Sequence, residues 1–134
     1  MPTVVFYGDS IVTGWRGISS PNKRWTTIVS ERLGWRELNL AINGVGFVRR
    51  RGADRTDDGE ALGLLPDYPP GWKAVRQILQ EETHRVGLRL VPGLATAINR
   101  NDALLCSDGV HPDDAGHAAL ADSIEPHLRA ALFQ

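Results

Sequence analysis

A serine stands where the first apolar run of the chain ends. Residues 3–6 read "TVVF", and the stretch that follows, "YGDSIVTG", places Ser10 directly after Asp9. A hydroxyl at such a point serves either as a nucleophile or as a turn residue that bonds the backbone. The choice depends on a base elsewhere in the chain, because a serine hydroxyl is a weak nucleophile until its proton is removed.

A candidate base lies near the other end of the chain. The segment "SDGVHP" places Asp108 and His111 three residues apart in a turn that contains a glycine. Histidine is the side chain best matched to taking a proton near neutral pH. An aspartate bonded to its second ring nitrogen fixes the tautomer and stabilises the imidazolium. Together the residues predict acyl transfer, with Ser10 as nucleophile, His111 as base and Asp108 as the residue that orients it.

Strands and helices must bring these residues together, and the sequence predicts that they alternate. Short apolar or alternating runs predict strands at 3–7, 36–42 and 88–91. Helical periodicity predicts helices at 19–34, 71–87 and 112–133, the last kinked at Pro126. Alternation of this kind is typical of an α/β fold with a parallel sheet.

Three stretches are expected to meet at one edge of that sheet, because each follows the carboxyl end of a predicted strand. In parallel α/β sheets this is the edge where ligands bind. Ser10 follows the first strand, and Asn43 with Gly44 follows the second. The segment 106–117 follows the third.

The composition describes an ordinary soluble protein. The chain has 134 residues, enough for one domain spanning 1–134, with 42% hydrophobic and 23% charged residues. A net charge of −1 gives no general attraction to nucleic acid or to membranes. Cys106 is the single cysteine, so no internal disulfide forms. With neither a signal peptide nor a membrane helix recognisable, we expect a cytoplasmic protein without nucleic-acid or membrane partners.

The motifs resemble those of the GDSL or SGNH hydrolase family. The resemblance rests on "GDSIVTGW" near the N-terminus, "NGVG" after the second strand and "SDGVHP" near the C-terminus, and it covers about residues 3–48 and 71–132. It implies a three-layer, flavodoxin-like α/β fold and a serine ester hydrolase that acts on a small ester or acetylated substrate without a cofactor. It also implies an oxyanion hole formed by the backbone N–H groups of Ser10 and Gly44. Asp9 and Asn43 are the residues expected to bind substrate.

One block of the family pattern is not found. The family has a Gly-x-Asn-Asp block after its third strand, whose asparagine completes the oxyanion hole; "NRND" contains Asn101 and Asp102, but out of order. The segment between Ile42 and Leu88 predicts only one convincing helix, whereas the family pattern needs two strands and two helices there. We therefore expect a sheet shortened in its centre, a loop or deletion at 49–70, and possible self-association through an exposed sheet edge. The alternative function is a catalytically impaired remnant or binding module.

Other interpretations of single residues stay open. Acidic and histidine side chains near the C-terminus could hold a metal ion, although Asp113 and Asp114 suit the start of the last helix. The apolar context "LLC" favours a buried, inert Cys106 over a reactive thiol. Further candidates are an anion site at 49–51 and aromatic substrate contacts from Trp15 and Trp72; the metal candidates are Asp108, His111, Asp113, Asp114 and His117.

Overall fold

The computed structural model describes residues 1–44, 69–91, 97–98 and 101–132. The chain divides into two compact units. The first combines Met1–Asn43 with Gly93–Gln134, and the second is Gly44–Pro92.

The first unit contains a small parallel sheet. Strand β1 (Thr3–Phe6) pairs with β2 (Arg36–Asn39), in a register that sets Val5 opposite Leu38. Alternate side chains point to opposite faces of the sheet, so the partly buried residues of both strands lie on one face. On the other face, Val5 is 43% exposed and Leu38 is 44% exposed. Within the described ranges these are the only two strands.

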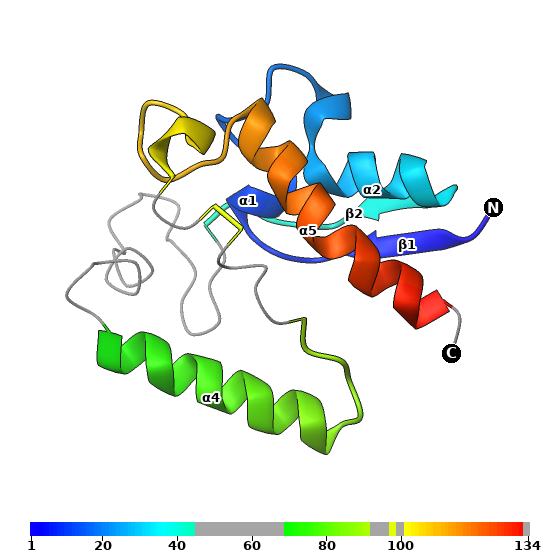
Figure 1. Cartoon of the computed structure of the whole chain (residues 1–134), viewed down its shortest axis with the longest axis vertical. Helices are drawn as coiled ribbons and strands as arrows, with labels where there is room; N and C mark the ends of the chain where they lie inside the picture. Colours follow the sequence, from blue (N-terminus) through cyan, green and yellow to red (C-terminus); the bar gives the residue numbers. More distant parts are fainter. Residues whose placement is uncertain (45–68, 92–96, 99–100, 133–134) are drawn as a thin grey trace. The chain divides into compact units, whose positions relative to one another are not determined.

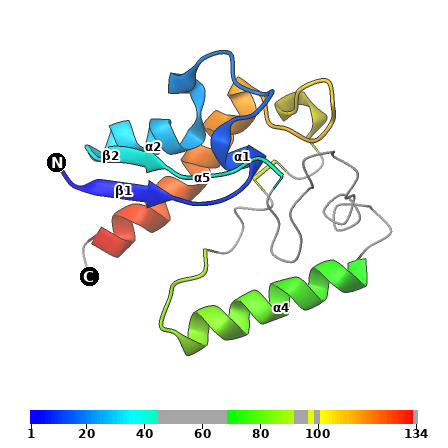
Figure 2. The same cartoon turned by 180° about the vertical axis from the view of Figure 1, so that it is seen from behind.

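The helices of this unit lie between β1 and β2 and near the C-terminal end of the chain. Helix α2 packs against α5, and their facing residues form the core: Trp25, Val29, Leu120, Ala121 and Ile124. Figures 1 and 2 show α1 at the carboxyl end of β1. The elements are α1 (Ser10–Thr13), η1 (Pro21–Lys23), α2 (Trp25–Leu33), η3 (Asp102–Leu104) and α5 (Asp114–Leu132).

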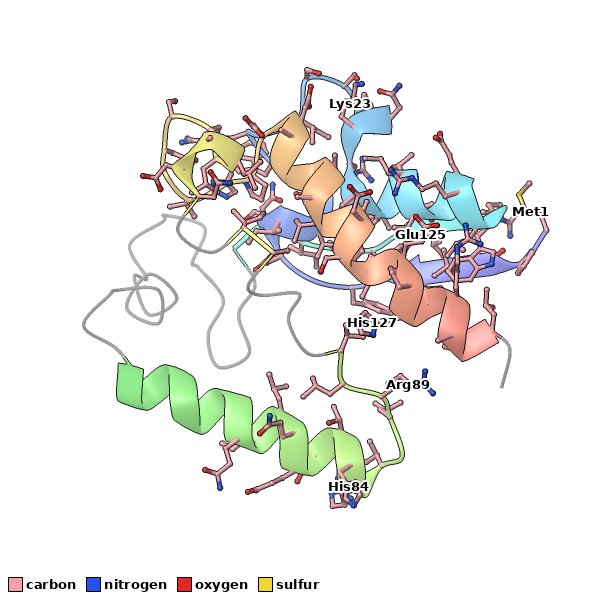
Figure 3. The ribbon with its side chains drawn as sticks, in the orientation of Figure 1. Met1, Lys23, His84, Arg89, Glu125 and His127 are labelled. Carbon is pink, nitrogen blue, oxygen red and sulfur yellow. The ribbon has the colours of Figure 1, made fainter. Side chains whose placement is uncertain are left out.

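Polar contacts add to the apolar packing of α2. Arg32 reaches Asp122 at 2.7 Å and Glu125 at 2.9 Å on α5, where Figure 3 labels Glu125. On the sheet side, Glu37 of β2 accepts hydrogen bonds from the hydroxyls of Thr26 and, at 2.6 Å, Thr27. Burial alone raises the pKa of Glu37, but these hydrogen bonds outweigh it and hold that pKa below its usual value. The ionised carboxylate therefore ties β2 to the first turn of α2.

The predicted helix at 19–34 is present but starts later than expected. Pro21 begins a separate 3₁₀ turn, and Arg24 is extended at φ −65° and ψ 134°, so the α-helix starts at Trp25. Its end is confirmed: Gly34 adopts φ 68°, a left-handed conformation that glycine enters at little cost. The last helix was expected at 112–133, and α5 continues through Pro126.

The second unit contains α4 (Pro69–Arg85), which confirms the helix expected at 71–87. The strand predicted at 88–91 is wrong. Gly87 turns at φ 72°, and the N–H of Leu88 donates to the carbonyl of Thr83 at 2.8 Å, so that amide caps the helix. Leu88 is 66% exposed. Of the loop expected at 49–70, the last two residues belong to α4, and 49–68 lie outside the described residues.

A membrane-spanning helix needs about 20 mostly apolar residues, a requirement that applies to the helices of the described ranges. None of them is long and apolar enough to cross a bilayer.

Candidate active site

Ser10 is the first residue of α1. Helix α1 lies just beyond the carboxyl end of β1 (Figure 1). The carboxylate of Asp9 caps this helix by accepting from the N–H of Ile11 at 2.9 Å. A Cβ on Gly8 would lie 2.4 Å from Val12 Cγ2, so only glycine fits there. The sequence "GDS" thus encodes a tight turn, its cap and the serine that it presents. Asp9, expected to bind substrate, holds this turn through its side chain.

His111 and Asp108 lie on a tight hairpin before α5. Leu105 and Pro112 form an antiparallel bridge, and the N–H of Cys106 donates to the carbonyl of His111 at 2.8 Å. Gly109 turns the chain with φ 68°. These contacts fix the backbone on both sides of the two side chains.

The hairpin folds the Asp108 carboxylate back onto its own backbone. Its Oδ1 accepts from the N–H groups of Val110 and His111, both at 2.9 Å. Its Oδ2 lies 2.6 Å from His111 Nδ1. The carboxylate is therefore oriented by its own loop, with one oxygen left for the imidazole.

Ser10 and Asp108 contact opposite nitrogens of the His111 ring. The distance from Ser10 Oγ to His111 Nε2 is 3.0 Å, although 101 residues separate the two in sequence. An ionised carboxylate can only accept, so we assign the ring proton to Nδ1 and the acceptor role to Nε2. The Ser10 hydroxyl then donates to Nε2, as removal of its proton by a base requires.

Hydrogen bonds keep Asp108 ionised. The Cys106 thiol, the backbone N–H groups of His111 and Val110 and then the His111 ring together hold the pKa of Asp108 far below its usual value. The expectation that Cys106 is buried is wrong. The residue is half-buried, and its Sγ–H donates to Asp108 Oδ1 at 3.0 Å. The apolar neighbours of Cys106 in sequence do not surround its side chain, because the hairpin turns it toward the carboxylate.

Two contacts join the segment after Ser10 to the segment after His111. A Cβ on Gly17 would lie 1.6 Å from the carbonyl oxygen of Pro112, so the two backbones touch. The N–H and hydroxyl of Ser19 donate to the two carboxylate oxygens of Asp114 at 2.8 and 2.5 Å, which lowers the pKa of Asp114. We call residues 17–19 against 112–114 the clamp. No local pattern marks Gly17 or Ser19, since their partners lie 95 residues away in the sequence.

The two aspartates at the start of α5 have different hydrogen-bond partners. Asp113 caps the helix by accepting from the N–H of Gly116 at 2.9 Å, as expected. Asp114 was expected to share that role but binds Ser19 in the clamp instead.

His117 is fully buried, and its Nδ1 accepts from the N–H of Trp25 at 3.2 Å. Burial lowers the pKa of His117 to about 4, against the opposing charges of Asp114 and Asp113. The wider metal site considered for the C-terminal segment is therefore wrong. In the part of the chain that the structure describes, Cys106, Asp108 and His111 form the one group of possible metal ligands.

Of the residues between β2 and α4, the structure describes 40–44. Asn43 Oδ1 accepts from the Thr13 hydroxyl at 2.5 Å, which ties this segment to the end of α1. Gly44 adopts φ 76° and opens the second unit. Asn101 is exposed beside η3, where its side chain makes no capping bond. Trp15 is 46% exposed, and the anion site considered at 49–51 lies outside the described residues.

Comparisons with known proteins support the fold. No family model and no curated protein matches the chain. Among solved structures, the crystal structure of TesA matches with a TM-score of 0.73 and 17% sequence identity. The match covers 96% of this chain and 98% of that one. The chain thus shares its overall fold with TesA, and its described residues include a small parallel sheet flanked by helices. A fold can host many functions, so the chemistry has to be argued from the site.

Proposed function

We propose that this SGNH-like chain is a serine ester hydrolase that works through an acyl-enzyme on a small ester or acetylated substrate. The observation that carries the proposal is the contact of His111 with Ser10 Oγ at 3.0 Å on one side and with Asp108 at 2.6 Å on the other. Serine, imidazole and carboxylate in this order form the arrangement that activates a serine for attack on an acyl carbon.

The reaction follows from the roles of the three side chains. Ser10 Oγ bonds to the acyl carbon while its proton passes to His111 Nε2, and the carbonyl oxygen becomes an oxyanion. The intermediate then expels the alcohol oxygen, which takes the proton from Nε2 and leaves as the free alcohol. Water attacks the Ser10 ester in the same way, with His111 again as base, and releases the acid.

Asp108 acts through the imidazole. Its ionised carboxylate holds the Nδ1–H tautomer before the reaction and stabilises the imidazolium after Nε2 has gained the serine proton. Two backbone N–H groups fix one of its oxygens at 2.9 Å, so the carboxylate is already oriented toward the ring before substrate arrives.

The oxyanion requires hydrogen-bond donors at the other side of the acyl carbon. The N–H of Ser10 is suited to this because a group at the first position of a helix has no acceptor within that helix. We assign the second donor to the N–H of Gly44, as the family resemblance implies. Without an asparagine equivalent to that of the missing block, turnover should be lower by roughly 10²–10³.

The test is hydrolysis of p-nitrophenyl acetate by the wild-type chain and by Ser10→Ala. The alanine variant should lose the activity, whereas Ser107→Ala, which removes an exposed hydroxyl from the same hairpin as His111, should keep it. A fluorophosphonate should add one mass increment to the wild type and none to Ser10→Ala. Turnover that survives in Ser10→Ala would refute the assignment.

The alternative, a remnant or binding module without turnover, is favoured by the missing block. A wild-type chain that unfolds cooperatively yet neither hydrolyses the ester nor reacts with the fluorophosphonate would establish that alternative.

A further inference from the structure

We propose that Cys106, Asp108 and His111 bind a thiophilic divalent cation such as Zn²⁺, and that the bound ion disables His111 as a base. The binding itself is independent of the proposed hydrolase function, while its effect on turnover rests on that function.

The three possible ligand atoms already lie close together. Cys106 Sγ is 3.0 Å from Asp108 Oδ1, His111 Nδ1 is 2.6 Å from Asp108 Oδ2, and the ligand atoms of the group lie within 4.8 Å of one another. Zinc binds sulfur at about 2.3 Å and nitrogen or oxygen at about 2.0–2.2 Å. Donors around one tetrahedral ion are therefore about 3–4 Å apart, which these side chains can reach by small movements.

The ligand types select the kind of ion. A thiolate, an imidazole and a carboxylate suit zinc, whereas Mg²⁺ and Ca²⁺ require mostly oxygen ligands. Cys106 and His111 are only partly buried, and the Asp108 side chain is 24% exposed, so an ion can enter and keep water in its fourth position.

The hairpin supplies the support that such ligands need. The N–H groups of Val110 and His111 hold Asp108 Oδ1, which leaves Oδ2 on the side of the imidazole. The backbone bridge from Leu105 to Pro112 closes the loop that carries the three ligands. Outer hydrogen bonds of this kind orient metal ligands and strengthen binding.

Protons account for the effect on Ser10. Without metal, Sγ–H and Nδ1–H both donate to Asp108, and Nε2 accepts from the Ser10 hydroxyl. When the ion binds, the thiol proton leaves to solvent and Nδ1 gives its electron pair to the metal. The neutral imidazole then carries its proton on Nε2. In that tautomer Nε2 is a donor and cannot take the proton of Ser10.

Calorimetric titration of the whole chain with zinc sulfate tests the binding. We expect one site, and Cys106→Ser, which puts a hydroxyl in place of the soft thiolate ligand, should weaken it by about tenfold or more. His84→Gln is the matched control, because His84 is an exposed histidine on α4 (Figure 3) and its loss should leave the affinity unchanged. Equal affinity of the wild type and Cys106→Ser would overturn the proposal, as would a loss of binding in His84→Gln.

The histidine tautomer and the turnover separate this proposal from the proposed function. Nitrogen NMR of His111 should show the ring proton moving from Nδ1 to Nε2 on addition of zinc. Ester hydrolysis should fall as zinc is added and return with a chelator, with Cys106→Ser needing about tenfold more zinc for the same loss. If zinc binds but the chain hydrolyses no ester, only the proposed function is refuted. If the chain hydrolyses the ester at a rate that zinc does not change, only this inference is refuted.

Discussion

Acidification should destabilise the chain through His117. This imidazole is fully buried, and its Nδ1 accepts from the Trp25 N–H, so the neutral ring carries its proton on Nε2. Among the described residues Nε2 has no hydrogen-bond partner. Charging the ring would place a proton on Nδ1, remove the bond to Trp25 and bury an unpaired cation. The folded state therefore favours neutral His117.

The sign and size of the effect follow from the two pKa values. Burial lowers the pKa of His117 to about 4 in the folded chain, against about 6.5 for an unfolded histidine. The unfolded chain thus binds the proton more readily, and this contribution to stability is complete above pH ~6.5 and lost as the pH falls toward 4. Linkage gives a loss of at most about 2 kcal/mol in the free energy of unfolding between pH 7.5 and pH 5.0.

Urea unfolding at the two pH values measures this loss. The wild type should lose up to about 2 kcal/mol more than His117→Gln, which keeps an acceptor for the Trp25 N–H but does not titrate. His127→Gln on the same helix should behave like the wild type. The wild type and His117→Gln differ in no other ionisable group, so the difference between their losses isolates His117. An identical loss in wild type and His117→Gln would refute a buried, neutral His117.

Three further outcomes are expected. Gly17→Ala should lower both turnover and melting temperature sharply, because its Cβ would meet Pro112, while Gly34→Ala, which meets no atom, should cost only about 1 kcal/mol; equal effects would argue against the clamp. Asp108→Asn should reduce ester hydrolysis by up to about 10⁴ with little change in unfolding, since the amide favours the wrong imidazole tautomer; near wild-type turnover would contradict the role of Asp108. Sedimentation velocity at rising concentration should show self-association through an exposed sheet edge, and a single monomer boundary throughout would exclude it.

The parts of the site that sequence could predict are those encoded locally. The turn at Ser10 and the hairpin at Asp108 and His111 each depend on hydrogen bonds within a few residues, so their motifs carry the information. The same holds for helix ends, as at Gly34. The prediction that the two motifs face each other came from the resemblance and from the general rule on parallel sheets.

Features that depend on distant partners were not predictable in this way. The amide of Leu88 can pair in a sheet or cap a helix, and the composition of 88–91 does not show which partner it meets. Gly17 looks like any loop glycine until Pro112 is placed against it. Cys106 follows two leucines, yet its environment is set by a carboxylate that the hairpin brings to it.

The pairing of the two ends of the chain has a consequence for biosynthesis. The contacts Ser10–His111, Trp25–His117 and Arg32–Asp122 span 101, 92 and 90 residues, so none of them can form before residues 111–122 have been translated. Until α5 leaves the ribosome, Ser10 lacks His111 and the apolar face of α2 lacks α5. Contacts of such sequence separation also slow folding, because the loop must close before they form. Newly made chains should therefore depend on chaperones that recognise exposed apolar helices, until α5 has docked.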